Sequence, residues 1–270
     1  MKYSLVLPTF NEAASGVLQA NLSQFAGRTD VECLCVDGGS TDGTAALARY
    51  AGVPWIAAPG RTRAARLNIG MRAARGRWIV CVHPRSLLPP DALAGLDALV
   101  DPLAWGGWTH TFDHAHPLLR FTSWYSNRMR ADRRSIFYLD HCLFLRRDLV
   151  STLGTELFPD VPIFEDTEAS LRLRALGRGV RLPQRVVTSS IRFTRAGVLR
   201  QSWRNQCAKL WYRAGLDLVQ LNRLYEGRQP LNGVAPIGQA ISPSARASAA
   251  VSTSRSIGSS SNGTPARVSS

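Results

Sequence analysis

The sequence has 270 residues, of which 45% are hydrophobic, enough to bury the core of one sizeable domain with or without an appendage. Its net charge is +14, almost all of it from arginine because Lys2 and Lys209 are the only lysines. This charge favours anionic partners, including membrane surfaces. It does not indicate nucleic-acid binding, because the sequence has no RRM, KH or helix-turn-helix signature and no lysine-rich face.

The cysteines and the N-terminus predict a cytoplasmic protein. The cysteines are five in number and form no C-x-x-C pair, which is typical of reduced, mostly buried thiols. The opening apolar run ends at Pro8, too early for a signal peptide or a membrane span.

Residues 2–112 alternate short apolar runs with helical patterns, which predicts an α/β sheet. The expected strands are Tyr3–Leu7, Glu32–Val36, Trp55–Ala57 and Trp78–Val82. The expected helices are Ala14–Phe25, Thr44–Tyr50, Ala64–Ala74 and a segment from Pro89 and Pro90 to about Leu99.

From Trp105 onward the pattern is less regular. It predicts helices at Leu118–Arg130 and Thr167–Leu176, a strand at His141–Arg146, and a long amphipathic helix from Arg195 to Tyr225 with a break at Gly215. Beyond Gly227, Ser, Ala, Gly and Pro dominate, so residues 228–270 are predicted to be a disordered tail.

Two polar motifs follow the first two predicted strands. Pro8-Thr9-Phe10-Asn11-Glu12 ends the first strand, and Asp37-Gly38-Gly39-Ser40-Thr41-Asp42-Gly43 ends the second. Open α/β sheets bind ligands at the carboxyl ends of their strands, and paired glycines let the backbone approach a ligand closely. Each motif alone is also compatible with ordinary helix capping.

Together, at this spacing, the two motifs resemble the start of family-2 glycosyltransferases, in particular the small bacterial proteins of that family. The resemblance spans roughly residues 3–225 and includes Arg66-Leu67-Asn68-Ile69-Gly70, Pro89-Pro90-Asp91-Ala92-Leu93, Asp140-His141-Cys142-Leu143-Phe144 and Phe164-Glu165-Asp166-Thr167-Glu168. It implies a GT-A fold over residues 1–227, with a nucleotide-binding half at about 1–100, an acceptor half at about 101–227 and a C-terminal helix.

The resemblance also implies roles for individual residues. It assigns the donor nucleotide to Pro8, Thr9, Asn11, Glu12, Asp37, Gly38, Arg66, Asn68 and Arg85, with Asp37 at the base of the nucleotide. It assigns the acceptor to Asp140 and His141.

Glu165 and Asp166 are the candidate catalytic carboxylates. In an inverting transfer the acceptor hydroxyl loses its proton as it attacks the anomeric carbon, and a carboxylate within hydrogen-bond reach accepts it. Adjacent residues at a helix start point in different directions, so we expect Asp166 to be the base and Glu165 to cap or to pair with an arginine.

Arg85 departs from the family pattern. The resemblance leads us to expect a divalent cation, Mg²⁺ or Mn²⁺, on an aspartate after the fourth strand, but this stretch reads His83-Pro84-Arg85-Ser86. Three interpretations are open: Arg85 contacts the diphosphate in place of the metal, His83 and the substrate phosphates hold the cation, or the protein binds without catalysis.

The remaining histidines and aromatic residues give weaker signals. His110, His114 and His116 have zinc-like spacing but no Cys or carboxylate to complete a set, so we expect solvated loop histidines. His141 either binds a sugar hydroxyl or packs. The basic, aromatic C-terminal helix is expected to cover the sheet, and docking on anionic lipid is the alternative.

The sequence thus predicts an inverting transferase that moves a sugar from a UDP- or GDP-sugar to an acceptor hydroxyl. The acceptor is a carbohydrate, a lipid-linked molecule or another small molecule, with peripheral contact to the inner face of the membrane as an option. The alternative is a degenerate protein that binds a sugar nucleotide without turning it over.

Overall fold

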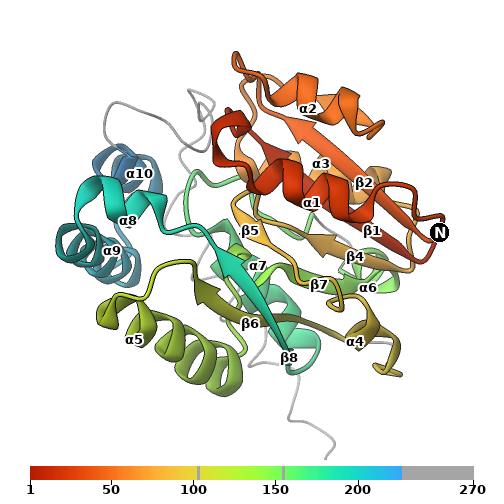
Figure 1. Cartoon of the computed structure of the whole chain (residues 1–270). Coiled ribbons are helices and arrows are strands. Elements are labelled where there is room, and N and C mark those ends of the chain that lie inside the picture. Colours follow the sequence, from red (N-terminus) through yellow and green to blue (C-terminus); the bar gives the residue numbers. More distant parts are fainter. Residues whose placement is uncertain (102–103, 154–155, 227–270) are drawn as a thin grey trace, which may run out of the picture. The chain divides into compact units, whose positions relative to one another are not determined.

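The computed structural model describes residues 1–101, 104–153 and 156–226. In these residues one mixed sheet of eight strands has the order β3-β2-β1-β4-β7-β6-β8-β5 (Figure 1). The strands are β1 (Tyr3–Thr9), β2 (Val31–Asp37), β3 (Trp55–Ala57), β4 (Trp78–Cys81), β5 (Ser86–Leu87), β6 (Trp105–Phe112), β7 (Leu143–Arg146) and β8 (Val180–Thr188). The predicted α/β sheet is confirmed.

Helices cover both faces of the sheet. On one face pack α1 (Val17–Phe25), α2 (Thr44–Tyr50) and α4 (Ala94–Asp97). On the other face pack α3 (Arg63–Ala73), α6 (Arg147–Thr152) and α7 (Glu165–Leu176). The strands feed both cores by alternation: in β1, Leu5 and Leu7 point to the first core and Val6 to the second.

The remaining helices lie beside the sheet (Figure 1). They are the 3₁₀ turns η1 (Ala13–Ser15) and η3 (Leu139–His141), α5 (Pro117–Tyr125) with its π-helical continuation η2 (Ser126–Asp132), α8 (Ile191–Ala196), α9 (Val198–Arg213) and α10 (Leu218–Glu226). None of the helices in the described ranges is both long and apolar enough to cross a membrane.

The strand directions bring six carboxyl ends to one edge of the sheet. Strands β1, β2, β3 and β4 are parallel, with Thr9 opposite Asp37 at the ends of β1 and β2. Strand β7 is antiparallel to both β4 and β6, so β6 runs in the same direction as β4, and β8 is parallel to β6. The chain that leaves β1, β2, β3, β4, β6 and β8 therefore emerges at the same edge, where ligands bind in open α/β sheets.

Several predicted boundaries were wrong. The helix expected from Pro89 begins only at Ala94. Before it, the N–H groups of Ala92 and Ala94 bond to carbonyls three residues earlier, which forms turns and not an α-helix. The expected C-terminal helix divides into three, with breaks at both Gly197 and Gly215, where φ is 84° and 76°. The predicted tail, residues 228–270, lies outside the described residues.

Candidate active site

A cavity of about 220 Å³ opens at the carboxyl edge of the sheet. Its walls come from the segments that follow β1, β4 and β8, from the end of β6, and from the N-terminal turns of α3 and α7. Side chains of η2, η3, α8, α9 and α10 complete it. Segments from both halves of the described chain thus meet around one cavity.

The two polar motifs form one hydrogen-bonded unit beside this cavity. Asn11, with φ of 53°, accepts a bond on Oδ1 from the N–H of Thr41 at 2.9 Å, and its own N–H donates to Ser40 Oγ at 2.8 Å. The N–H of Glu12 donates to Thr44 Oγ1 at 2.8 Å. The side chains of Asn11 and Glu12 therefore do not cap the first helix. Asn11 joins the two loops and is exposed outside the cavity.

Asp37 organises the second loop from the end of β2. Its carboxylate accepts hydrogen bonds from Thr9 Oγ1 at 3.1 Å and from the N–H groups of Gly39 and Ser40 at 2.9 and 2.7 Å. Both Asp37 and Thr9 are buried, and neither lines the cavity. They lie at the paired ends of β2 and β1 and are not part of the cavity wall.

Arg66 lies between this loop and the cavity. Its side chain is 1% exposed, donates to the carbonyl of Thr9 and lines the cavity, and burial lowers its pKa to about 10. Gly38 lies so close to Arg66 that a Cβ added to the glycine would be 3.1 Å from Arg66 Nη1. Gly38 thus makes room for the guanidinium. Pro8 also lines the cavity.

Asn68 has a different position from the one expected. It lies outside the cavity wall and forms paired hydrogen bonds with the backbone of Phe158, at 2.7 Å to its carbonyl and 3.1 Å from its N–H. This contact fixes the segment that leads to α7, the helix of the candidate base. Asn68 itself has no contact with the cavity.

Arg85 and Glu12 form an ion pair in the cavity wall. Arg85 Nε donates to Glu12 Oε2 at 2.7 Å, with side chains 18% and 7% exposed. His83 also lines the cavity, and its Nδ1 accepts the N–H of Arg85 at 3.1 Å. In the described residues no group of three His, Cys, Asp or Glu side chains could hold a metal ion. Arg85 neutralises Glu12, which leaves His83 with the charge of Asp140 in the same cavity wall, and one imidazole with one carboxylate is a poor fit for Mg²⁺ or Mn²⁺.

The two carboxylates that begin α7 have separate environments. Glu165 is 1% exposed and forms an ion pair with Arg63, which comes from the N-terminus of α3. Asp166 lines the cavity, where its Oδ2 accepts the N–H of Leu139 at 3.0 Å and its Oδ1 the N–H of Thr167 at 2.7 Å. Of the two, Asp166 is the carboxylate that can meet a ligand.

The pKa of Asp166 is raised to about 7. Burial is the main cause, and the neighbouring charge of Glu165 adds to it, while Arg63 and the N–H of Leu139 oppose it. A carboxylate with this pKa accepts a proton near neutral pH more readily than an ordinary aspartate.

Strained backbone lies next to the site residues. Among the described non-glycine residues, Asn11, Ser135, Cys142 and Phe164 have positive φ, of 53°, 50°, 52° and 64°. All of them except Ser135 directly adjoin a candidate residue, and such conformations persist where surrounding contacts hold them in place. Phe164, for example, packs on the ring of Tyr212, with centroids 4.5 Å apart.

The two residues expected to bind the acceptor have different positions relative to the cavity. Asp140 lines the cavity. His141 is fully buried behind it, with Nε2 2.9 Å from Ser126 Oγ and Nδ1 2.8 Å from the carbonyl of Trp108. Because both ring nitrogens form hydrogen bonds within the protein, His141 supports the cavity wall and has no free nitrogen for an acceptor.

His110 is not the solvated loop histidine that the sequence predicted. It lies on β6, is 3% exposed and lines the cavity, and neither ring nitrogen has a hydrogen-bond partner among the described residues. Arg130 and Lys209, which the sequence placed in basic segments without a role in the site, also line the cavity, from η2 and α9. Their signal was weak, because neither belongs to a contiguous motif.

The family model described as "Glycosyl transferase family 2" matches residues 4–154, more than half of the chain. The chain belongs to glycosyltransferase family 2. No curated protein matches the sequence.

Solved structures share the fold of this glycosyltransferase. The mannosyltransferase PcManGT from Pyrobaculum calidifontis, in complex with GDP-Man and Mn²⁺, is 21% identical with a TM-score of 0.58, over 95% of this chain and 76% of that one. TarS from S. aureus is 15% identical with a TM-score of 0.57, over 84% of this chain. Glucosyl-3-phosphoglycerate synthase from Mycobacterium tuberculosis, with Mn²⁺, UDP and glucosyl-3-phosphoglycerate, is 18% identical with a TM-score of 0.54, over 80% of each chain.

These similarities show the GT-A fold and confirm the expectation from the sequence. The chain spans only 42% of the length of TarS.

We expect the Arg63–Glu165 pair to carry a large part of the site's stability. In Arg63→Met, Glu165 remains buried without a partner, which lowers the free energy of unfolding by about 3 kcal/mol, measured by urea denaturation. The matched control is Arg72→Met on the same helix, whose pair with Glu156 is 57% and 55% exposed and contributes less than about 1 kcal/mol. Equal losses in the two variants would contradict the assignment.

Proposed function

We propose that this family-2 glycosyltransferase transfers a sugar from a nucleoside-diphosphate sugar, UDP- or GDP-linked, to an acceptor hydroxyl with inversion, and that Asp166 is the base. The observation that carries the proposal is the position of Asp166, a carboxylate with a raised pKa in the wall of a cavity rich in arginine. The complexes of the similar structures with UDP or GDP-Man support the class of donor.

The chemistry requires one proton transfer and one displacement. The acceptor oxygen attacks the anomeric carbon, the bond from that carbon to the β-phosphate oxygen breaks, and the nucleoside diphosphate leaves with the electron pair. Asp166 takes the acceptor proton and later releases it to solvent. Glu165 is paired with Arg63 and does not line the cavity.

The donor diphosphate is assigned to two arginines, Arg66 in the first turn of α3 and Arg85 after β4. Arg66 and Arg85 line the cavity beside Glu12, and a guanidinium can bind phosphate oxygens through two N–H groups at once. We infer that Arg85 supplies the positive charge that a divalent cation supplies elsewhere in the family. The developing charge on the leaving group is then stabilised by fixed guanidinium groups.

Asp166→Asn tests the base. At pH 8 we expect release of UDP or GDP from a panel of sugar nucleotides to fall at least about 100-fold, with nucleotide affinity within about twofold of the native protein. The exposed Asp91→Asn is the control for loss of a carboxylate. Because Asp166 must be deprotonated to act, native kcat/KM should rise with pH through about 7.

Full turnover in Asp166→Asn, or a flat profile between about pH 5.5 and 8.5, would exclude Asp166 as the base. Nucleotide binding without consumption of any donor would instead favour the degenerate, non-catalytic alternative.

Arg85→Asp tests the replacement of the cation. Calorimetry of UDP and GDP should give the same affinity for the native protein in EDTA and in Mn²⁺. In the variant, the introduced carboxylate and Glu12 would form a carboxylate pair, so binding should weaken about tenfold in EDTA and recover with Mn²⁺. Arg77→Asp, on an exposed side chain outside the cavity, is the charge-matched control. Metal-dependent binding by the native protein would refute the replacement.

We also propose peripheral contact with an anionic membrane through α9. The sequence favoured a helix that covers the sheet, but α9 buries only Gln201 and Ala208. Its apolar side chains Leu199, Trp203 and Leu210 are 75%, 71% and 59% exposed among arginines. Exposed tryptophan and leucine beside basic side chains suit the interface of an anionic bilayer.

Trp203→Ser tests this contact by cosedimentation with vesicles. We expect the variant to lose most of the native binding to vesicles that contain phosphatidylglycerol, with little binding to neutral vesicles in either protein. Tyr50→Ser, at a 91% exposed aromatic residue on α2, should bind like the native protein. Equal loss in both variants would argue against α9.

A further inference from the structure

The part of the cavity contributed by η2 and by the C-terminal helices carries positive charge without a carboxylate partner. Arg130, Arg192 and Lys209 line it, and no described Asp or Glu forms an ion pair with any of them. Arg63 and Arg85, by contrast, each pair with a glutamate. The two groups of cations in one cavity therefore differ in how far they are neutralised.

Arg130 is a buried cation held by aromatic rings. Its side chain is 9% exposed, with the guanidinium carbon 5.0 Å from the ring centroid of Tyr125 and 4.8 Å from that of Tyr138. These rings fix its position and leave its charge intact. A buried charge without a counter-ion is costly unless a ligand supplies one.

Lys209 reaches the same region from α9. It is partly buried, and its pKa is lowered to about 7 by burial and by the charges of Arg130 and Arg213. An ammonium group beside two guanidinium groups and no carboxylate is stabilised by a bound anion.

His110 adds an independent observation. It is only 3% exposed, lines the cavity, and has no partner on either ring nitrogen within the described chain. Burial and the charge of Arg130 lower its pKa to about 3, so the ring is neutral and offers one N–H donor and one acceptor. Unpaired buried nitrogens in a cavity wall are typical of a group that binds ligand.

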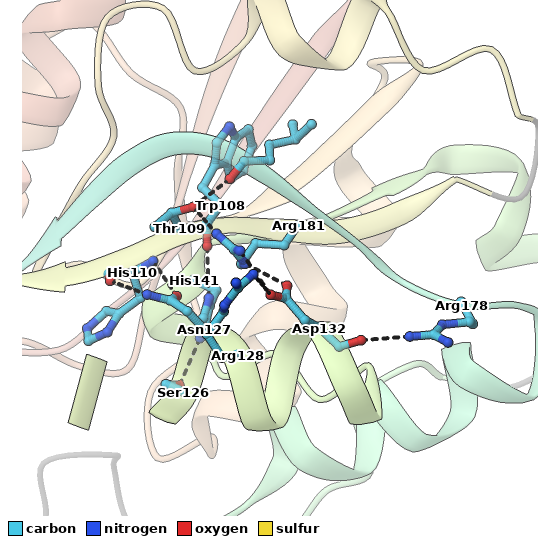
Figure 2. Close-up of polar contacts among 11 residues, drawn as sticks. Trp108, Thr109, His110, Ser126, Asn127, Arg128, Asp132, His141, Arg178 and Arg181 are labelled. Atoms are coloured by element: carbon cyan, nitrogen blue, oxygen red, sulfur yellow. Dashed lines mark hydrogen bonds and ion pairs between the residues drawn. The ribbon is translucent and has the colours of Figure 1, made fainter. Parts of the chain in front are cut away.

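The backbone around these residues is fixed by polar contacts (Figure 2). Asn127 bridges η2 to β6 through both backbone groups of His110, each at 2.9 Å. Arg181 of β8 binds Asp132 at the end of η2, at 2.7 Å from Nε to Oδ1. These contacts position η2, and with it Arg130, relative to His110.

The same group of residues adjoins the base. Arg130 lies over the ring of Tyr138, and the next residue, Leu139, donates its N–H to Asp166. An anion bound at Arg130 would thus lie near the point where the acceptor hydroxyl loses its proton.

We propose that Arg130, Lys209 and His110 form a subsite for an anionic group, phosphate or carboxylate, that the acceptor carries near its reactive hydroxyl. The proposal rests on the proposed function, since it names the chemical class of the acceptor for that reaction. A soluble phosphorylated or carboxylated molecule and a lipid-linked phosphate share this chemistry.

Inorganic phosphate is the probe, titrated by calorimetry into full-length protein saturated with UDP or GDP. We expect millimolar binding that weakens about tenfold or more in Lys209→Met and largely recovers in Lys209→Arg. Arg200→Met removes an exposed charge from the same helix and should leave phosphate affinity unchanged. Nucleotide affinity should stay within about twofold in all variants, and thermal melting should confirm that each one is folded.

Three results would overturn the subsite: no phosphate binding to nucleotide-loaded protein, equal binding in Lys209→Met, or displacement of phosphate by UDP or GDP. If neither nucleotide binds, the donor assignment fails. Phosphate binding to the free protein that requires Lys209 would still support the subsite.

Vesicles that contain phosphatidic acid distinguish the two sources of the anion. Weaker binding of Lys209→Met to these vesicles, together with weaker phosphate binding, supports a lipid-linked phosphate. Unchanged vesicle binding with weaker phosphate binding supports a soluble acceptor.

Discussion

The N-terminus of α7 places two carboxylates side by side in the protein interior, and only Glu165 has a guanidinium partner. Arg63 is the first residue of α3, so the ion pair links α3 to α7, the helix that carries Asp166. Burial raises the pKa of Asp166, and the neighbouring Glu165, which is paired with Arg63, raises it further. One buried pair therefore holds two helices together and helps to set the basicity of the neighbouring group.

The Arg85–Glu12 pair imposes a second constraint. A guanidinium carries a single positive charge where a divalent cation carries two, but its N–H groups have fixed directions and it needs no coordination shell. Because Glu12 already accepts one of these N–H groups, the remaining ones are oriented before a ligand arrives. The guanidinium is therefore oriented in advance toward an anionic ligand.

The polar strand ends beside the cavity were predictable from the sequence, whereas much of the cavity wall was not. Contiguous motifs mark the ends of β1 and β2, and the structure places them at one edge of the sheet. Strand β6 was not predicted as a strand, because paired glycines such as Gly106 and Gly107 are more typical of a turn. Here an added Cβ on Gly106 would lie 1.8 Å from the carbonyl of Val180, so close contact between strands requires the glycine.

Single residues from distant segments were harder still to predict. Arg130 and Lys209 belong to different helices and have no neighbours in sequence that identify them among so many arginines. Asn68 and His141 matched family positions, yet their hydrogen bonds go to the protein itself. A sequence motif identifies which residues lie near a site, but it does not distinguish a group that faces the cavity from one that supports it.

The way each arginine is held explains why the cavity has two electrostatic regions. A carboxylate fixes a guanidinium and neutralises it, as Glu12 does for Arg85 and Glu165 for Arg63. An aromatic ring also fixes a guanidinium, but it contributes only a quadrupole and leaves the net charge in place. Arg130 is held in this second way, so its field remains available to a ligand. The positive charge around Arg130 is therefore less neutralised than the charge around Arg63 and Arg85.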